Sequence, residues 1–121
     1  MEIDFEAKLR EAVLQLEKHG VEYAHAKALS WQMQEMRKVV KASEMQKITD
    51  GTMVERENMA RVSSVYVEHI EGTASAIEKE HSAKARYERW FAQMECLRSL
   101  CSRETAKIKA IGGTDADSGG G

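Results

Sequence analysis

The sequence between residues 62 and 111 repeats mainly apolar side chains at alternating steps of four and three. The positions are Val62, Tyr66, His69, Thr73, Ala76, Glu80, Ala83, Tyr87, Trp90, Met94, Leu97, Cys101, Glu104, Ile108 and Ile111. This 62–111 seam would form one narrow stripe of a helix, which must be buried against another helix. An unbroken helix over this stretch would be about 70 Å long, whereas a compact domain of this size is only about 30 Å across. The pattern therefore predicts an elongated protein, or one assembled from several copies.

Composition favours an all-α fold. The chain of 121 residues contains no proline, 31% of its residues are charged, and helix-forming residue types are prominent. The turn chemistry that a β-sheet requires is missing. Only 6% of the residues are aromatic, so one copy has little bulk for a deep core. Self-association would relieve that shortage.

Start and stop signals predict a short first helix. Asp4 can cap it, and Gly20 would end or bend it. Its apolar stripe is Phe5, Leu9, Val13 and Leu16. A second helix is predicted from about residue 21 to residue 48. The expected stripe of this second helix is Ala26, Leu29, Met33, Met36 and Val40.

The segment Thr49-Asp50-Gly51 is a turn signal between the second helix and the next. Thr52 and Glu55 then form a T-x-x-E capping box that starts a new helix. Ser63 or Ser64 would restart this helix, and Gly72 would bend it.

These boundaries predict an elongated antiparallel helical hairpin with a short N-terminal helix, self-associating through its heptad-like seam. Residues 1–111 would form a single helical domain, and residues 112–121 (GGTDADSGGG) a flexible Gly-rich tail. The seam residues expected at oligomer contacts are Tyr87, Trp90, Met94, Leu97, Cys101 and Ile108. The polar seam positions His69, Glu80 and Glu104 have two interpretations: they set register or oligomer state, or the seam drifts outward there.

Charge is unevenly distributed, although the formal net charge is only −2. Residues 23–49 carry five basic and two acidic side chains, and the candidate nucleic-acid-binding residues in this segment are Arg37, Lys38, Lys41 and Lys47. The first three fall within one helical turn and suit backbone phosphates. A second basic stretch, Arg98 to Lys109, follows aromatic residues that could stack on bases. The alternative is that these charges form a solvated face and that the aromatic residues belong to the seam.

Two E-x-x-H segments, residues 22–25 and 78–81, match the pattern of di-iron carboxylate bundles. No matched pair of bridging glutamates accompanies them, so surface positions are the better interpretation and we expect no metal. No phosphate loop or nucleophile elbow is present, and we expect neither enzymatic activity nor a cofactor. Cys96 and Cys101 form no CxxC pair, and no apolar run approaches the ~20 residues that span a bilayer. We expect a cytoplasmic protein without a membrane partner.

The segment Val40-Lys41-Ala42-Ser43, followed by Gly51, resembles the L-K-A-R…G segment of UvsY-type phage recombination mediators. Further similar features are Glu55-Arg56-Glu57, Ala60, Tyr66 and the closing pattern Met94…Leu97-Arg98-Ser99-Leu100…Lys107. The similarity extends over roughly residues 23–109.

Mediators of this family are small helical proteins that assemble into ring-like oligomers and bind single-stranded DNA. They help to load a RecA-like recombinase while the single-strand-binding protein is displaced. The resemblance implies a homo-oligomer with the same kinds of partner, in which Lys41 takes the place of the family's DNA-contacting lysine. The family's neighbouring arginine is Ser43 here. The alternative function is a structural coiled-coil scaffold, chaperone or adaptor that binds no nucleic acid.

Overall fold

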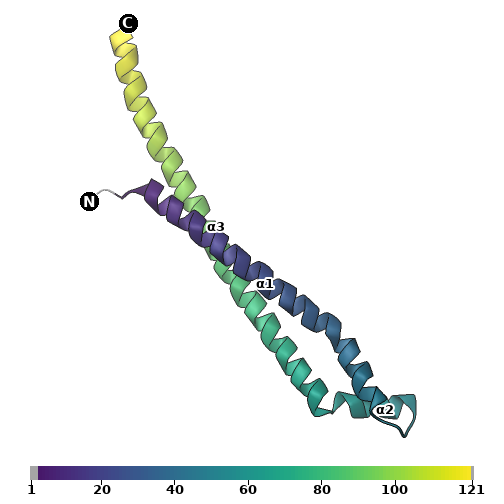
Figure 1. Ribbon diagram of the computed structural model, residues 1–121. Coiled ribbons are helices and arrows are strands. Elements are labelled where there is room, and N and C mark those ends of the chain that lie inside the picture. The colour runs from purple at the N-terminus through teal and green to yellow at the C-terminus, as the bar shows by residue number, and fades with distance from the viewer. Residues whose placement is uncertain (1–2, 121) are drawn as a thin grey trace. The chain divides into compact units, whose positions relative to one another are not determined.

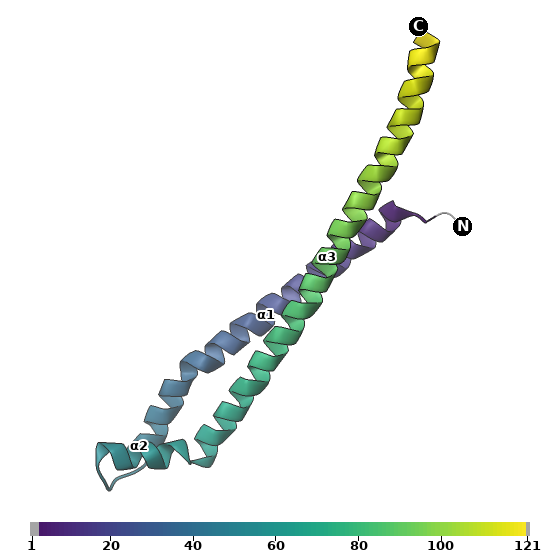
Figure 2. The same cartoon turned by 180° about the vertical axis from the view of Figure 1, so that it is seen from behind.

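The computed structural model describes residues 3–120, and the side chains of residues 3–112. It contains the helices α1 (Phe5–Gln46), α2 (Met53–Arg61) and α3 (Ser64–Gly120), and no strand occurs in the described residues (Figure 1). The predicted all-α antiparallel hairpin is confirmed, because α1 and α3 pack against each other and the short α2 lies in the connection between them (Figure 2). The side chains of the predicted tail lie outside the described residues from residue 113 onward, so its flexibility stays a prediction.

The prediction of a separate short N-terminal helix is wrong. α1 continues through Gly20 without a break and is 42 residues long. A helical glycine costs only about 1 kcal/mol relative to alanine, which neighbouring turns and packing can offset. At this position a Cβ atom would lie 3.3 Å from Cε2 of Tyr87, so the glycine gives room to the tyrosine ring. Gly72 likewise lies inside α3, where a Cβ would lie 3.0 Å from Cε of Met33.

The predicted helix starts are confirmed by their capping bonds. The backbone N–H of Ala7 donates to Oδ1 of Asp4 at 3.0 Å, and that of Glu55 donates to Oγ1 of Thr52 at 3.2 Å. At the start of α3, Oγ of Ser63 accepts from the N–H of Tyr66 at 3.2 Å. These side chains satisfy backbone donors that have no partner inside the helix.

The turn between α1 and α2 depends on Gly51, whose φ angle is 106°. A side chain at this angle would be strained, whereas glycine adopts it readily. The turn signal at residues 49–51 is therefore correct, although α1 ends at Gln46 rather than at Ile48.

The 62–111 seam faces inward over most of its length. Every position from Tyr66 to Cys101 is buried or half-buried. The exposed positions are Val62, Glu104, Ile108 and Ile111. Of the polar positions, His69 and Glu80 remain inside the seam, and the seam drifts outward only at Glu104. Nε2 of His69 lies 2.9 Å from the carbonyl oxygen of Met33, which satisfies the half-buried ring.

α1 carries a second seam with steps of four and three, which was not predicted from the sequence. Its positions are Phe5, Leu9, Ala12, Leu16, His19, Tyr23, Ala26, Ser30, Met33, Arg37, Val40 and Glu44. All but Arg37 are buried or half-buried. The expected stripe members Val13, Leu29 and Met36 are exposed, so this part of the prediction is wrong. The pattern was missed because the seam uses small and polar side chains, of which Ser30 is fully buried.

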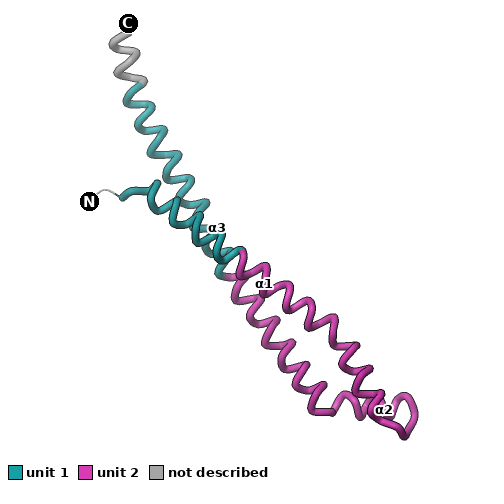
Figure 3. The backbone as a smooth tube through the Cα atoms, in the orientation of Figure 1, with its two compact units in different colours: residues 1–20, 86–121 teal, residues 21–85 magenta. Residues whose placement is uncertain are grey.

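The chain divides into two compact units, residues 1–20 with 86–121 and residues 21–85 (Figure 3). In the first unit, the ring of Trp90 stacks on that of His19 with 6.2 Å between centroids. Leu97 is buried, and Met94 and Cys101 are half-buried. Five of the six residues expected at oligomer contacts thus contribute to packing inside the chain, while Ile108 is exposed. Their role between copies stays a prediction.

Candidate nucleic-acid interface

In the second unit, five side chains from all three helices line a pocket of about 290 Å³. They are Arg37, Lys38 and Lys41 of α1, Arg61 of α2 and Tyr66 of α3. We call this the cationic pocket. Three of the four basic residues predicted to bind nucleic acid lie together here, because residues 37, 38 and 41 fall within about one turn of α1.

The capped turns around α2 bring the last two members to the pocket. Thr52 starts α2 directly after the turn at Gly51, and Ala60, which is fully buried, fixes the end of α2 inside the unit. Arg61 is the last residue of α2, and Tyr66 lies in the first turn of α3. The chain reversal therefore returns a guanidinium group and a phenol ring to the side of α1 that carries the predicted cations.

Glu57 of α2 bridges two of the cations. Its Oε1 accepts from Nζ of Lys41 at 2.9 Å and from Nη2 of Arg61 at 2.7 Å. The hydrogen bond and charge of Lys41, followed by the charge of Arg61, hold the pKa of Glu57 below its usual range. Because the pKa is lower in the folded chain, this pairing stabilises the fold above the ordinary glutamate pKa. The contribution is lost as the pH falls through the lowered value.

The other two cations of the pocket have no such partner. Within the described residues, the side chains of Arg37 and Lys38 make no hydrogen bond or ion pair, and both are exposed. The pocket therefore presents four cations, of which Lys41 and Arg61 are paired with Glu57, while Arg37 and Lys38 are open to an external anion. Arg37 stands at a position of the α1 seam where the other members are covered, so its exposure here departs from the packing pattern of that helix.

Lys47, the fourth predicted residue, does not line the pocket. Its Nζ donates to Oε1 of Glu44 at 2.8 Å, and the carboxylate of Glu44 is almost completely buried. This lysine neutralises a buried charge at the end of α1.

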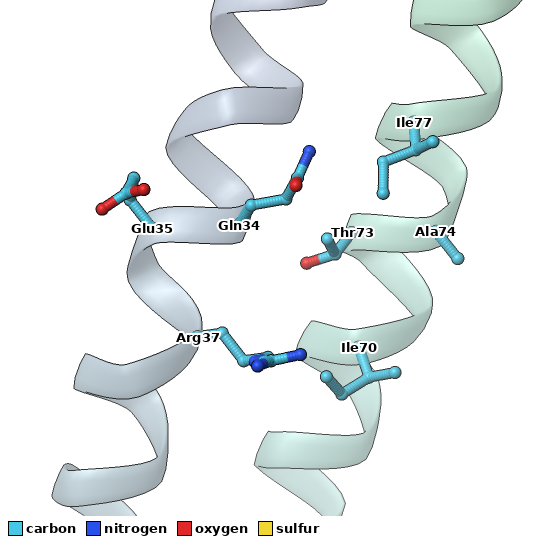
Figure 4. A pocket seen from close by; sticks show the side chains of 7 residues that line it. All are labelled: Gln34, Glu35, Arg37, Ile70, Thr73, Ala74 and Ile77. Carbon is cyan, nitrogen blue, oxygen red and sulfur yellow. The ribbon is translucent and has the colours of Figure 1, made fainter.

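An open groove of about 450 Å³ adjoins the cationic pocket (Figure 4). Its lining comprises Gln34, Glu35, Arg37, Ile70, Thr73, Ala74 and Ile77. Arg37 lines both spaces. Trp31 is 65% exposed and lies three and four residues before Gln34 and Glu35, hence on the same face of α1. Basic and apolar side chains thus occur side by side in this unit.

In the second predicted basic stretch, at least one of the cations is already paired within its own helix. Nη1 of Arg98 donates to Oε1 of Glu95 at 3.1 Å. Tyr87 and Trp90 are half-buried on the inward seam, so the seam interpretation of these two aromatic residues is correct. Phe91 is 47% exposed.

Sequence reasoning missed Arg61, Tyr66 and the internal carboxylate of Glu57. Arg61 and Tyr66 are distant from the predicted cluster along the chain. The predicted turn at residues 49–51 was the available signal, because it folds the chain back beside residues 37–41. The length of α2 then decides which residues meet the cluster.

The fold and the site together define a helical hairpin with a cationic pocket beside an apolar groove. No family model, curated protein or solved structure matches the chain. Among the residues with described side chains, no three His, Cys, Asp or Glu residues gather as ligands for a metal ion. None of the helices, as far as they are described, combines the length and apolar character needed to cross a membrane.

Proposed function

We propose that this protein binds single-stranded nucleic acid through the cationic pocket of its second unit. The observation that carries the proposal is the pair of unpartnered cations, Arg37 and Lys38, beside the ring of Tyr66. Phosphate contacts by Lys and Arg supply most of the affinity for nucleic acid when there is no sequence readout. Lys41 and Arg61 add positive potential although Glu57 offsets part of it.

A single strand suits this surface better than a duplex does. Tyr66 and the exposed Trp31 offer flat faces, and the faces of unpaired bases stack on aromatic rings in a way that tolerates any sequence. A duplex keeps its base faces inside the helix and presents mainly phosphates and groove edges. We therefore expect single strands to bind more tightly than duplexes of equal charge.

The resemblance to UvsY-type mediators extends this proposal to the biological role. Several copies would each contribute one weak pocket, and a common strand would bind them with much higher combined affinity. Such an assembly would help to load a RecA-like recombinase in competition with a single-strand-binding protein. Lys41, the counterpart of the family's DNA-contacting lysine, is a member of the pocket, whereas Ser43 is exposed outside it.

The test is a titration of labelled single-stranded DNA at several salt concentrations, with fluorescence anisotropy as the signal. We compare the wild-type chain with a double variant, Arg37→Gln with Lys38→Gln. We expect at least about tenfold weaker binding at low salt. The slope of log affinity against log salt should fall by about 1.4, because each single-strand phosphate contact contributes about 0.7.

The matched control removes the same amount of charge elsewhere: Lys18→Gln with Lys79→Gln, two exposed positions outside the pocket. This control should retain most of the affinity. Equal losses in both double variants, or wild-type binding that does not depend on salt, would exclude the pocket as the interface.

A second candidate function is a scaffold or adaptor that binds another protein. It is favoured by exposed apolar side chains in and after α2. These are Met53, Val54, Met59 and Val62, which are 64%, 66%, 54% and 77% exposed. Apolar side chains that cluster on a surface often mark protein contacts. Absence of strand binding at low salt would leave this candidate as the better one.

A further inference from the structure

The groove beside the cationic pocket has one apolar wall and one polar wall. Ile70, Ala74 and Ile77 of α3 follow helical spacing, so they form a continuous apolar strip along it. The opposite wall belongs to α1. Gln34 and Arg37 extend from it toward α3, whereas Glu35 points away from α3 (Figure 4). A guest in this groove would therefore meet an apolar surface and polar groups at its edge.

The polar groups at the edge are held in defined positions. Nε2 of Gln34 donates to Oγ of the fully buried Ser30 at 3.0 Å, which leaves the amide oxygen of Gln34 as an acceptor. Thr73, which is almost completely buried, donates its hydroxyl proton to the carbonyl oxygen of His69 at 2.8 Å. Its oxygen can still accept. The groove thus combines an apolar wall with hydrogen-bond acceptors in defined positions.

Arg37 connects this groove to the cationic pocket, since its side chain lines both. The guanidinium group extends across the groove toward Ile70 (Figure 4). A guanidinium plane can contact a phosphate through its N–H donors or stack on the face of a base. A ligand that places an anion in the pocket and a flat ring in the groove would use both properties.

We infer that the groove formed by Ile70, Ala74 and Ile77 receives a nucleobase of the strand whose phosphate lies in the cationic pocket. This inference rests on the proposed function and names the part of the strand that the groove recognises. A nucleobase fits the chemistry because it has an apolar face and N–H donors at its edge. The groove volume of about 450 Å³ lies within the range of about 300–1,000 Å³ typical of small-molecule pockets. The adjoining cations select a guest that is covalently linked to an anion.

The experiment compares an oligothymidylate strand with an abasic strand of the same length and phosphate charge. The wild-type chain should bind the strand with bases at least about fivefold more tightly, the lower end of what stacking of one base contributes. Replacing the apolar wall by Ile70→Gln should remove most of this preference and leave the affinity for the abasic strand unchanged. The matched control is Val65→Gln, an exposed α3 position that lines neither space.

The outcomes separate this inference from the proposed function. If wild-type affinity is equal for both strands, or if Ile70→Gln weakens both strands equally, the groove does not receive a base. The Arg37→Gln with Lys38→Gln variant should still weaken both strands, because it removes phosphate contacts. If the Arg37→Gln with Lys38→Gln variant loses binding but Ile70→Gln has no effect, the proposed function stands and the nucleobase is not the occupant of the groove. An apolar segment of a protein would then be the better occupant. Far-UV circular dichroism confirms that each variant remains helical.

Discussion

At the scale of single residues, Glu57 places a negative charge inside a site built of cations. It holds Lys41 and Arg61 at 2.9 Å and 2.7 Å, which are distances that phosphate oxygens would also adopt. A bound phosphate must therefore compete with a carboxylate that the chain itself supplies.

We predict that Glu57→Gln raises the affinity for single-stranded DNA. The carboxylate of Glu57 occupies the place beside Lys41 and Arg61 where a phosphate oxygen would lie, and two negative charges this close repel each other, so we expect a gain of a few fold in affinity. The measurement is the same anisotropy titration at low salt.

Glu78→Gln is the control, since it changes the net charge equally at an exposed position of α3 that lines neither the cationic pocket nor the groove. If both variants gain the same affinity for single-stranded DNA, the effect comes from net charge, and Glu57 does not compete with phosphate for the cationic pocket.

Single residues also show where sequence reasoning stopped. The cluster of Arg37, Lys38 and Lys41 could be predicted because neighbours on one helix are fixed by helical spacing alone. The partner of Lys41 could not, because a carboxylate sixteen residues away meets it only after the chain has reversed. That Arg37 occupies a position of the α1 seam was not predicted either, because an apolar residue is expected at such a position.

At the scale of helices, glycine had different consequences at different positions. Gly20 was expected to end or bend a helix and Gly72 to bend one, and neither glycine ends its helix. Gly51 does lie in a break between helices, because polar turn residues precede it and the N-cap Thr52 follows it. A lone glycine lowers helix stability slightly, whereas a turn segment with a cap stabilises an alternative structure. The hairpin could therefore be predicted from its turn, and the helix count could not be predicted from glycine alone.

We predict that Gly51→Ala destabilises the chain by about 1 kcal/mol or more, because alanine is strained at a φ of 106°. The free energy of unfolding is measured by urea denaturation with circular dichroism. Gly112→Ala is the matched control, since a Cβ there meets nothing within 4 Å. The control should be neutral or stabilising, because alanine favours helix. A similar loss of unfolding free energy in both variants would show that strain in the turn does not cause the destabilisation.

At the scale of the whole molecule, the main correction concerns how the 62–111 seam is used. Most of it is buried or half-buried within one chain, so positions 66–101 do not need other copies to cover them. The sequence predicted the seam correctly but could not show that α1 carries a matching seam, because many of its positions are small or polar. What remains uncovered is the end of the seam, where Ile108 and Ile111 are 64% and 67% exposed.

We therefore predict that copies associate through this uncovered end. Sedimentation equilibrium should give a mass above the 13.6 kDa of one chain, and Ile108→Gln with Ile111→Gln should lower it toward that value. The physical reason is that two neighbouring isoleucine side chains gain free energy when they leave water. Met53→Gln with Val54→Gln is the matched control, because these side chains are equally exposed, at 64% and 66%, but lie in α2.

A wild-type mass of 13.6 kDa, with and without single-stranded DNA, would exclude assembly and the combined affinity that depends on it. A mass lowered only by the α2 variant would instead place the contact at the closed end of the hairpin.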